Sequence, residues 1–444
     1  MKLRDAVLVF VSLFVPFVYF NHSDGWNQGA RLSELRAIVL RGTLSIDAYH
    51  DVTGDKALID GHYYSEKAPA LVLMAMPTFS ATVAAERLIG MDPDSPEGWR
   101  LSQWVATAGS VGLLAALGGV AFFALLVPQL GVPIALVSTY GVFLGSLTFP
   151  YATAMFAHGG TIGLLCIALW AALGHDGPRH DYLAGLFAGL AIATEYPAII
   201  PCTALGLYLF HIDAPRARRF GLALAPGALL ILGKNYLVSG SPFQVSYGSN
   251  PAFPQITYGN AFGFSLPDPE AVAGLLWSEY RGLFFWCPVL LMAIPGLVIL
   301  FRKHPPVAWM ITIVLAFILL QVSSFYSWFG GNAVGPRYLT PSLPFLGLAA
   351  AYGIKRFPIP GIALALLSIL LMVMVSAVAI DPPADVLTPL RSFYLVRVRD
   401  ARFAENLGTL LGANETLSLF ALAASVLVPA TWLVAGRSRG DGHR

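Results

Sequence analysis

Long apolar runs separated by short polar turns recur along almost the whole chain. A run of about 20 apolar residues can cross the hydrocarbon core of a bilayer as an α-helix. Only 12% of the 444 residues are charged, against about 25% in a typical soluble protein. The pattern predicts an all-α polytopic membrane protein, with apolar runs near residues 6–20, 69–90, 102–127, 131–149, 156–174, 183–196, 197–212, 220–238, 284–301, 306–324, 340–354, 358–380 and 416–436.

Short basic turns predict which helix ends face the cytoplasm, because Lys and Arg are enriched in cytoplasmic loops. They lie at 179, 216–219, 302–303, 355–356 and 437–444. If residue 68 is outside and residue 179 inside, an odd number of spans joins them, yet four apolar runs lie between. The run 69–90 holds two prolines and two charges, so we expect an interfacial or re-entrant helix pair there. About twelve spans remain, with both termini cytoplasmic.

The segments expected outside are longer and more polar than the cytoplasmic turns. They are 21–101, which is the first outer loop with its interfacial helices, 239–283, 325–339 and 381–415. We therefore expect residues 1–444 to form one membrane domain that acts at its outer face, in a bacterial inner membrane. The net charge of +2 gives no indication of nucleic-acid binding. Cys166, Cys202 and Cys287 lie in or beside apolar runs and are expected to be buried.

Residues 21–68 form the most polar stretch in the first half of the chain. Within it, Leu32, Leu35, Ile38 and Val39 recur at helical spacing, which predicts a surface helix over 27–41. The stretch ends in Tyr63-Tyr64-Ser65-Glu66-Lys67-Ala68-Pro69. A lysine at a membrane interface can bind a lipid phosphate, or it can anchor a helix end by snorkelling.

This stretch resembles the GT-C superfamily of membrane glycosyltransferases, in particular the family of protein O-mannosyltransferases and lipid A aminoarabinose transferases. Members have an arginine in a surface helix after the first span, followed by a "YFEKPP"-like motif. Here Arg31 lies in such a helix, and Tyr64 to Pro69 match the motif. The resemblance implies a GT-C-like fold in which Arg31 and Lys67 bind the polyprenyl phosphate of a donor.

The chain departs from that family where a catalytic acid is expected, because Gln28 stands three positions before Arg31. Asp24 and Asp47 are the alternative candidates for the base. The wider pattern, GTLSIDAY followed by DKA and DGHYYSEKAP, resembles bacterial members of the superfamily. It favours Asp47 as the base and Asp55 and Asp60 as substrate-binding residues, and Tyr64 of the motif over 64–69 is a further substrate-binding candidate. Each of these acids could also be a solvated loop carboxylate.

Polar residues in the later outer segments extend the candidate site. His158 and Glu195 fall at the outer ends of apolar runs, where an ionisable group is a functional candidate or a structural partner. Glu279, Arg281 and Tyr338 are further candidates for substrate binding. The motif WFGGNAVGPRYLTP over 328–341 resembles a signature of the same superfamily and implies that Arg337 binds the donor phosphate. An arginine fork matches a phosphate bidentately.

Together these patterns predict an inverting glycosyltransferase that moves a sugar from a polyprenyl-phosphate donor to a protein, lipid or glycan acceptor. No tightly spaced metal motif is present in the sequence, although the carboxylates could bind a divalent cation. Two alternatives remain. A transporter or flippase for a lipid-linked sugar would place ionisable residues at mid-membrane, whereas here they gather at one face. A non-catalytic envelope scaffold would explain the missing acid before Arg31.

Overall fold

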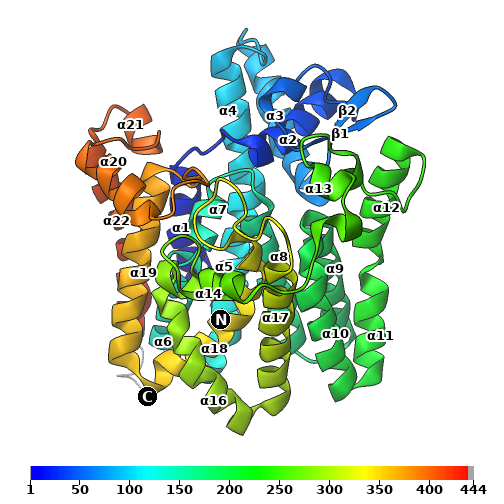
Figure 1. Cartoon of the computed structure of the whole chain (residues 1–444). Coiled ribbons are helices and arrows are strands. Elements are labelled where there is room, and N and C mark those ends of the chain that lie inside the picture. Colours follow the sequence, from blue (N-terminus) through cyan, green and yellow to red (C-terminus); the bar gives the residue numbers. More distant parts are fainter. Residues whose placement is uncertain (1, 439–444) are drawn as a thin grey trace.

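The computed structural model describes residues 2–438 and is almost entirely helical (Figure 1). The first part comprises α1 (Leu3–Tyr19), α2 (Trp26–Arg36), the strands β1 (Lys56–Ile59) and β2 (His62–Ser65), α3 (Ala70–Leu88), α4 (Pro96–Thr107), α5 (Leu113–Leu130), α6 (Val132–Phe143), α7 (Thr148–Ala152), α8 (Ala157–Gly174), α9 (Pro178–Thr194) and α10 (Ile199–Ile212). The two strands form an antiparallel hairpin.

The second part contains α11 (Ala214–Ala223), α12 (Ala225–Ser239), α13 (Pro254–Thr257), α14 (Pro269–Trp277), α15 (Leu283–Trp286), α16 (Ala293–Lys303), α17 (Pro305–Ser323), α18 (Leu343–Arg356), α19 (Pro358–Val378), α20 (Leu395–Arg399), α21 (Leu407–Leu410) and α22 (Glu415–Ser438). Proline stands at the first position of α9, α17 and α19, where its missing N–H costs no hydrogen bond and its fixed φ suits a helix. Most helices thus end at or near the turns that the sequence predicted.

Seven helices of the described chain are long and apolar enough to span a membrane, and Val132–Phe143 and Tyr196–Ile212 are shorter apolar helices. The protein is therefore an integral membrane protein. The count of twelve spans is not confirmed. The helix pair expected at 69–90 is wrong, because α3 runs as one continuous helix through Pro77. The helix packs against α2, α4 and α9, and Pro77 lies on its exposed side. Membrane helices tolerate an internal proline.

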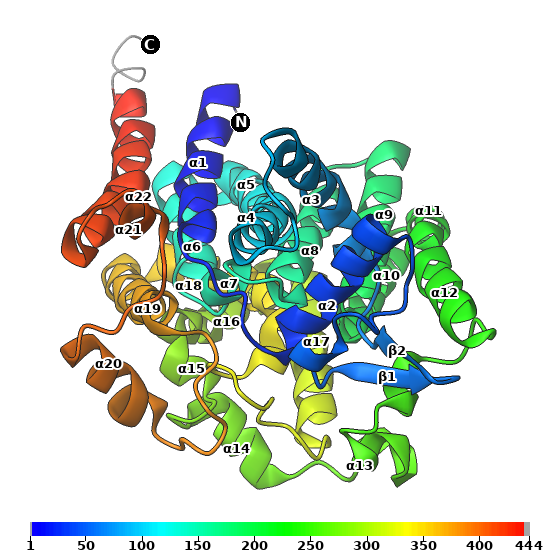
Figure 2. The same ribbon diagram turned by 90° about the horizontal axis from the view of Figure 1, so that it is seen from above.

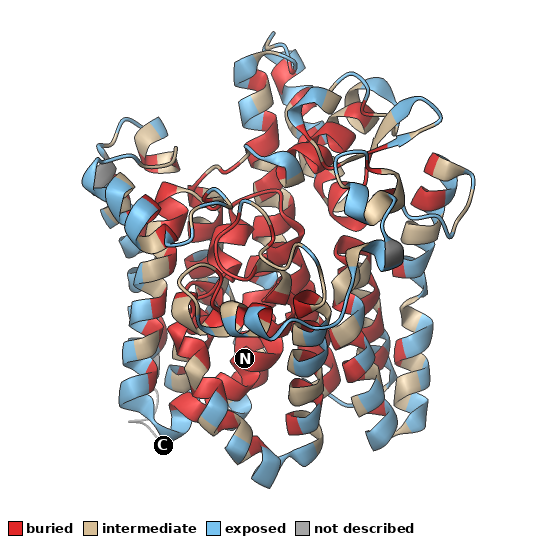
Figure 3. Cartoon of the chain, in the orientation of Figure 1, coloured by how far each residue is buried: buried red, intermediate tan, exposed pale blue. Residues whose placement is uncertain are grey.

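Close approach between small residues brings the central helices together. A Cβ added to Gly118 of α5 would lie 2.3 Å from the Cα of Gly163 in α8, and one added to Gly296 of α16 would lie 1.8 Å from a carbonyl oxygen of α18. Such contacts between small residues are a common basis of helix packing in membranes. Buried residues fill the centre of the bundle, and exposed ones lie on its outer helices (Figure 3).

The exposed residues of the outer helices include many large apolar side chains, such as Leu237 of α12, Phe317 of α17 and Leu370 of α19. A soluble monomer rarely leaves so much apolar surface uncovered, which fits a lipid environment around the bundle. Cys166, Cys202 and Cys287 are buried, as the sequence predicted, and carry free thiols.

One end of the bundle carries the loops, and we call it the loop-rich end. It bears α2, the β1–β2 hairpin, α13 and α21, while the α10–α11 and α16–α17 turns lie at the opposite end (Figures 1 and 2). The helix expected over 27–41 is present as α2 and a π-helical turn, Ala37–Arg41. Its apolar face, with Leu32 and Leu35, packs against α3 and α4, so this face contacts protein.

Candidate functional site

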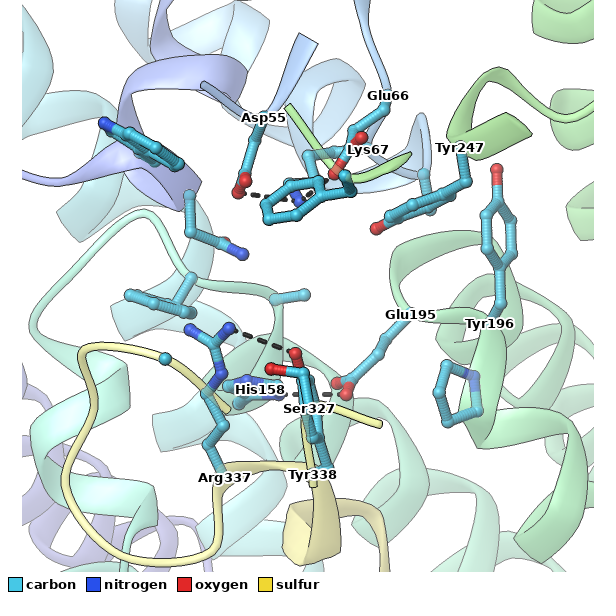
Figure 4. Close-up of a pocket in the computed structure, with 18 of the residues that line it drawn as sticks. Asp55, Glu66, Lys67, His158, Glu195, Tyr196, Tyr247, Ser327, Arg337 and Tyr338 are labelled. Atoms are coloured by element: carbon cyan, nitrogen blue, oxygen red, sulfur yellow. Dashed lines mark hydrogen bonds and ion pairs between the residues drawn. The ribbon is translucent and has the colours of Figure 1, made fainter. Parts of the chain in front are cut away.

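A cavity of about 1000 Å³ lies at the loop-rich end of the bundle. Its walls come from α2, the residues flanking the hairpin, the start of α8, the end of α9, and loops that include residues 247–264 and 325–338. Asp55, Glu66 and Lys67 lie on one side, and His158, Glu195 and Arg337 lie on the opposite side (Figure 4). Segments far apart in the sequence therefore place charged groups around one space.

Lys67 lies between two carboxylates on the hairpin side of the cavity. Its Nζ is 2.8 Å from Asp55 Oδ2 and 2.7 Å from Glu66 Oε1, and no more than 10% of any of these three side chains is exposed. Glu66 Oε2 also accepts a 2.6 Å hydrogen bond from Asn250 Nδ2. Burial alone would lower the pKa of Lys67, but the two carboxylates raise it above its usual value. Lys67 is therefore a charged group that the protein already neutralises.

A second buried ion pair fixes α2 beside this group. Lys234 Nζ of α12 lies 2.7 Å from Glu34 Oε1 and donates a 2.7 Å hydrogen bond to the carbonyl oxygen of Lys67. Burying a charged pair is favourable only when the geometry is good and further hydrogen bonds are made. This pair meets that condition, and it holds α2 and the backbone of Lys67 in one arrangement.

Arg31 projects from α2 into the same cavity without a carboxylate partner. Its guanidinium donates to the backbone carbonyl and the side chain of Asn27, while its Nε is buried and has no hydrogen-bond partner. In the described part of the chain, no Asp or Glu forms an ion pair with it. Burial lowers the pKa of Arg31, but a guanidinium stays protonated in proteins. Arg31 is thus a buried cation with an unused donor.

Arg337 repeats this arrangement on the opposite side. One of its Nη atoms lies 3.2 Å from the hydroxyl oxygen of Tyr338, and its guanidinium lies over the rings of Phe156 and Tyr338. Its Nε is buried and unpartnered, and the described chain provides no carboxylate partner. Gly330, with φ +79°, makes room for this side chain, since a Cβ there would lie 3.0 Å from Arg337 Nε.

Arg281 holds the loop that carries Arg337 in place through hydrogen bonds to its backbone. This fully buried side chain donates to the carbonyl oxygens of Phe329 at 2.6 Å, Gly331 at 2.8 Å and Tyr280 at 3.1 Å. Its guanidinium also lies 4.0 Å from the centre of the Tyr280 ring. Arg281 therefore uses its donors on backbone, and it does not line the cavity.

Glu195 and His158 form a buried pair in the cavity wall. Glu195 follows α9 in an extended conformation and lies 2.9 Å from His158 Nδ1 through its Oε1 atom. Its Oε2 atom is buried without a partner. The His158 ring stacks on Phe156 and meets the edge of Tyr151. The contact with His158 thus fixes one carboxylate oxygen of Glu195 and leaves the other without a hydrogen bond.

Asp381 contributes a further carboxylate, from the residues just after α19. It lines the cavity and is partly exposed. Burial raises its pKa to about 6, and the negative charge of Asp24 adds to this shift.

Aromatic side chains complete the cavity walls. They are Trp26, Phe156, Tyr196, Tyr247, Phe253, Phe262, Phe264, Phe325, Tyr326 and Tyr338. Asn250 and a backbone hydrogen bond from Tyr326 to Gly263 tie the 247–264 loop to its neighbours. Broad apolar surfaces with a few directed polar groups are typical of small-molecule sites.

The structure brings together a subset of the residues that the sequence nominated. Those that line the cavity are Arg31, Asp55, Lys67, His158, Glu195, Arg337 and Tyr338. Gln28, at the position where the family that the sequence resembles has an acid, also lines it and is buried.

The remaining nominees lie outside this cavity. Asp24 is exposed, and Asp60 occupies the hairpin turn with φ +50°. Tyr64 pairs with Ala57 in the hairpin, and Glu279 pairs with Arg391. The structure thus gives Asp24, Asp60, Tyr64 and Glu279 no contact with the space between the arginines.

Asp47 also lies away from the cavity, on the hairpin side. Its Oδ1 accepts a 2.6 Å hydrogen bond from the Tyr63 N–H, and its Oδ2 lies 2.6 Å from His62 Nδ1. Burial would raise its pKa, but these hydrogen bonds lower it to about 2. A carboxylate held this way organises a turn, so the geometry does not support Asp47 as the base.

Sequence reasoning missed Glu66, Tyr247 and Asp381 as cavity residues. Glu66 could have been found, because it adjoins Lys67 in the same motif. Asp381 could have been found as an acid directly after an apolar run. Tyr247 lies in a loop with many aromatic residues, and nothing in its spacing distinguishes it.

ArnT of Cupriavidus metallidurans, in its structure with undecaprenyl phosphate, has a similar fold. The structure bound to undecaprenyl phosphate matches with a TM-score of 0.50 and 19% identity, over 97% of this chain and 74% of that one. The apo structure matches with a TM-score of 0.48 and 18% identity, over 97% and 73%.

The archaeal oligosaccharyltransferase AglB from Archaeoglobus fulgidus, in complex with an inhibitory peptide and a dolichol-phosphate, matches with a TM-score of 0.47 and 14% identity, over 98% of this chain and 56% of that one. No protein-family model and no curated protein sequence matches the chain. The chain thus shares the fold of ArnT, and the resemblance predicted from the sequence is confirmed at the level of fold.

Proposed function

We propose that the protein transfers a sugar from a polyprenyl-phosphate donor to an acceptor at the loop-rich face of the membrane. One observation carries this proposal: Arg31 and Arg337 line one cavity, each has a buried Nε without a partner, and neither forms an ion pair with a carboxylate in the described chain. Buried donors are normally satisfied, and a guanidinium fork fits phosphate oxygens. A lipid phosphate would supply the acceptors that both arginines lack. The fold shared with ArnT, solved with undecaprenyl phosphate, supports this choice of ligand.

In the proposed reaction the bond between sugar and phosphate breaks and the phosphate gains negative charge. Fixed cations beside it would stabilise this charge more in the transition state than in the ground state. Arg31 and Arg337 are the first candidates because their charges are unpaired. Lys67 would take part by exchanging its contact with Asp55 or Glu66 for a phosphate oxygen. We propose a single displacement with inversion at the anomeric carbon.

The aromatic lining suits the sugar, since flat rings can stack on sugar faces while the polar groups fix its orientation. Ile199 of α10 and Val322 of α17 give the cavity an apolar margin, where an isoprenoid chain would leave toward the lipid. We place the reaction at the outer face of a bacterial inner membrane, with a protein, a lipid or a glycan as the acceptor.

The test is binding of undecaprenyl phosphate to the purified protein, followed by native mass spectrometry. We expect Arg31→Ala and Arg337→Ala each to weaken binding by about tenfold or more, the loss of a charge-assisted hydrogen bond. Arg302→Ala, an exposed arginine at the opposite end, is the matched control and should bind as wild type does. Wild-type affinity in both cavity variants would refute the proposal.

The same protein in proteoliposomes separates transfer from transport. A flippase would move the labelled lipid between leaflets without releasing its sugar, whereas the proposed enzyme would release lipid phosphate and glycosylate an acceptor. In the described part of the chain, no group of three or more His, Cys, Asp or Glu side chains is arranged to hold a metal ion. Repeating the transfer assay with EDTA tests the prediction of a divalent cation.

A further inference from the structure

Glu195 differs from the other carboxylates that line the cavity. Asp55 and Glu66 both contact the ammonium group of Lys67, and Asp381 is partly exposed. Glu195 is buried, meets no lysine or arginine in the ion pairs of the described chain, and keeps one oxygen without a partner. We propose that Glu195, oriented by His158, is the general base that removes the proton of the acceptor hydroxyl. This inference rests on the proposed function.

The contact with His158 sets the orientation of the carboxylate. Glu195 Oε1 can only accept from His158 Nδ1 when ionised, so Nδ1 carries the hydrogen in this pair. The ring of His158 is itself held by the face of Phe156, with ring centres 5.5 Å apart, and by the edge of Tyr151 at 5.0 Å. One oxygen of Glu195 is thereby fixed, and the other remains available to a ligand.

The unpartnered Oε2 atom of Glu195 destabilises the folded protein. A ligand that donates a hydrogen bond to this atom would remove the penalty. A buried polar atom without a hydrogen bond costs about 1–3 kcal/mol, and more when the group is charged. The side chain of Glu195 is only 9% exposed, so bulk water offers little compensation. A hydroxyl that donates to Oε2 would satisfy this atom and, in the same contact, place its proton next to a base.

The backbone explains how Glu195 reaches the cavity. The helix α9 ends at Thr194, and Glu195 has φ −153° and ψ 111° before a 3₁₀ turn, Tyr196–Ala198. Pro197 in that turn has no N–H to continue the hydrogen-bond ladder of α9, and its ring would clash with the carbonyl group four residues earlier. The chain therefore leaves the helix before Pro197, and the Glu195 side chain points into the cavity (Figure 4).

Glu195 and Arg337 lie in the same wall of the cavity, with His158 between them (Figure 4). In a displacement with inversion the attacking oxygen and the leaving phosphate occupy opposite faces of the anomeric carbon. The proposal therefore places the acceptor hydroxyl at Glu195 and the donor phosphate at Arg337, with the sugar over His158.

The step balances as follows. The acceptor O–H proton moves to Glu195 Oε2 while the acceptor oxygen forms a bond to the anomeric carbon. The bond from that carbon to the phosphate oxygen breaks, and its electron pair stays on the oxygen. The phosphodiester monoanion leaves as a phosphomonoester dianion, which Arg31 and Arg337 face. Glu195 then returns the proton to solvent, and no oxidant, reductant or further reactant is consumed.

The test uses a strain that lacks this protein. Mass spectrometry identifies the sugar that is missing from its envelope, and its membranes supply the natural donor and acceptor. Purified wild type or variant is added, and the initial rate of transfer is measured. We expect Glu195→Gln, which keeps the size of the side chain, to lower this rate by about 10²–10⁴-fold. Its affinity for undecaprenyl phosphate should stay that of wild type.

A matched pair of variants tests the role of His158 as a positioning residue. His158→Asn retains an N–H that can donate to Glu195, whereas His158→Phe removes it and keeps a ring for the contacts with Phe156 and Tyr151. We expect the asparagine variant to retain a substantial part of the rate and the phenylalanine variant to lose most of it, with both folding as wild type does. Equal rates in the two variants would refute the positioning role.

The outcomes separate this inference from the proposed function. If Glu195→Gln transfers sugar at the wild-type rate, or if Asp381→Asn shows the large loss and Glu195→Gln does not, then Glu195 is not the base and the transferase assignment stands. If the wild type neither binds undecaprenyl phosphate nor restores any envelope sugar, the proposed function fails, and this inference fails with it.

Discussion

Arginines at the two ends of the bundle have opposite surroundings. At the end that carries the α10–α11 turn, Arg216 binds Asp181 through Nε at 2.8 Å and Asp176 through Nη1 at 3.0 Å, and its Nη2 donates to the carbonyl oxygens of Ala172 and His175. At the loop-rich end, Arg31 and Arg337 have no carboxylate partner in the described chain, and the Nε of each is unused.

This difference distinguishes cations that stabilise the fold from cations whose donors are available to a ligand. A guanidinium has five N–H donors, and a protein that needs it only for structure satisfies them, as around Arg216. Leaving donors buried and unsatisfied destabilises the protein, so such an arrangement needs another cause. Lys67 is the intermediate case, because it lies in the cavity and yet is fully paired.

The largest effect is expected from Lys67→Met. It leaves Asp55 and Glu66 buried side by side without their shared cation, and breaking a buried pair in this way costs about 3–5 kcal/mol. We expect a lower melting temperature in detergent and loss of transfer. The double variant Lys67→Met/Asp55→Asn should recover part of the stability. A fully stable single variant would show that Lys67 is not the partner these acids need.

Arg337→Ala should give the opposite signature. We expect transfer to fall by about 10²–10³-fold, the cost of removing one charge-stabilising donor, while the melting temperature stays the same or rises because no ion pair is broken. Arg337→Lys should restore only part of the rate, since an ammonium lacks the planar fork. If Arg337→Ala lowered the melting temperature as much as Lys67→Met does, then Arg337 would also stabilise the fold and the distinction between the two cations would be wrong.

Arg216→Ala tests the paired arginine at the end of the bundle opposite the cavity. It removes donors from Asp181, Asp176 and two carbonyl groups, but Arg219 still contacts Asp181 at 2.8 Å. We expect the free energy of unfolding to fall by about 1–3 kcal/mol. Transfer per folded molecule should match that of wild type. A selective loss of transfer with normal stability would mean that the two ends are coupled.

A smaller effect is expected from Asp381→Asn, and it depends on pH. The pKa of Asp381 is about 6 in the folded protein, above the value of about 3.9 for an unperturbed Asp. Folding therefore favours the protonated form, and ionisation lowers stability as the pH rises from about 4 to 6. The asparagine variant should gain stability relative to wild type over this range. Melting curves at pH 4 to 7 test this, and a constant difference would contradict it.

The smallest effect is expected from Asp47→Asn. The Asp47 side chain is 43% exposed, and exposed contacts of this kind contribute less than about 1 kcal/mol. Its lowered pKa adds a stabilisation that is present above about pH 4 and is lost as the pH falls toward 2. We expect near-normal transfer and a slightly less stable hairpin at neutral pH. A loss of several orders of magnitude in rate would restore Asp47 as the base.

The sequence by itself determined most of the secondary structure and the class of fold. Apolar run length and the placement of proline and glycine depend on local rules, so the helices and the surface helix at 27–41 could be predicted. The resemblance of the short motifs around Arg31, Lys67 and Arg337 to the GT-C superfamily also predicted three residues that line one cavity. The continuous α3 could not be predicted, since its prolines and charges indicated a break, whereas the helix tolerates Pro77 on its exposed side.

Only the tertiary structure decided which charges meet. The spacing of Glu34 and Lys234, 200 residues apart, or of His158 and Glu195, 37 apart, carries no sign of contact. The sequence could not separate Asp47, which binds its own turn, from Asp55, which faces the cavity. Burial and hydrogen-bond partners give a carboxylate its role, and both depend on how distant helices and loops pack together.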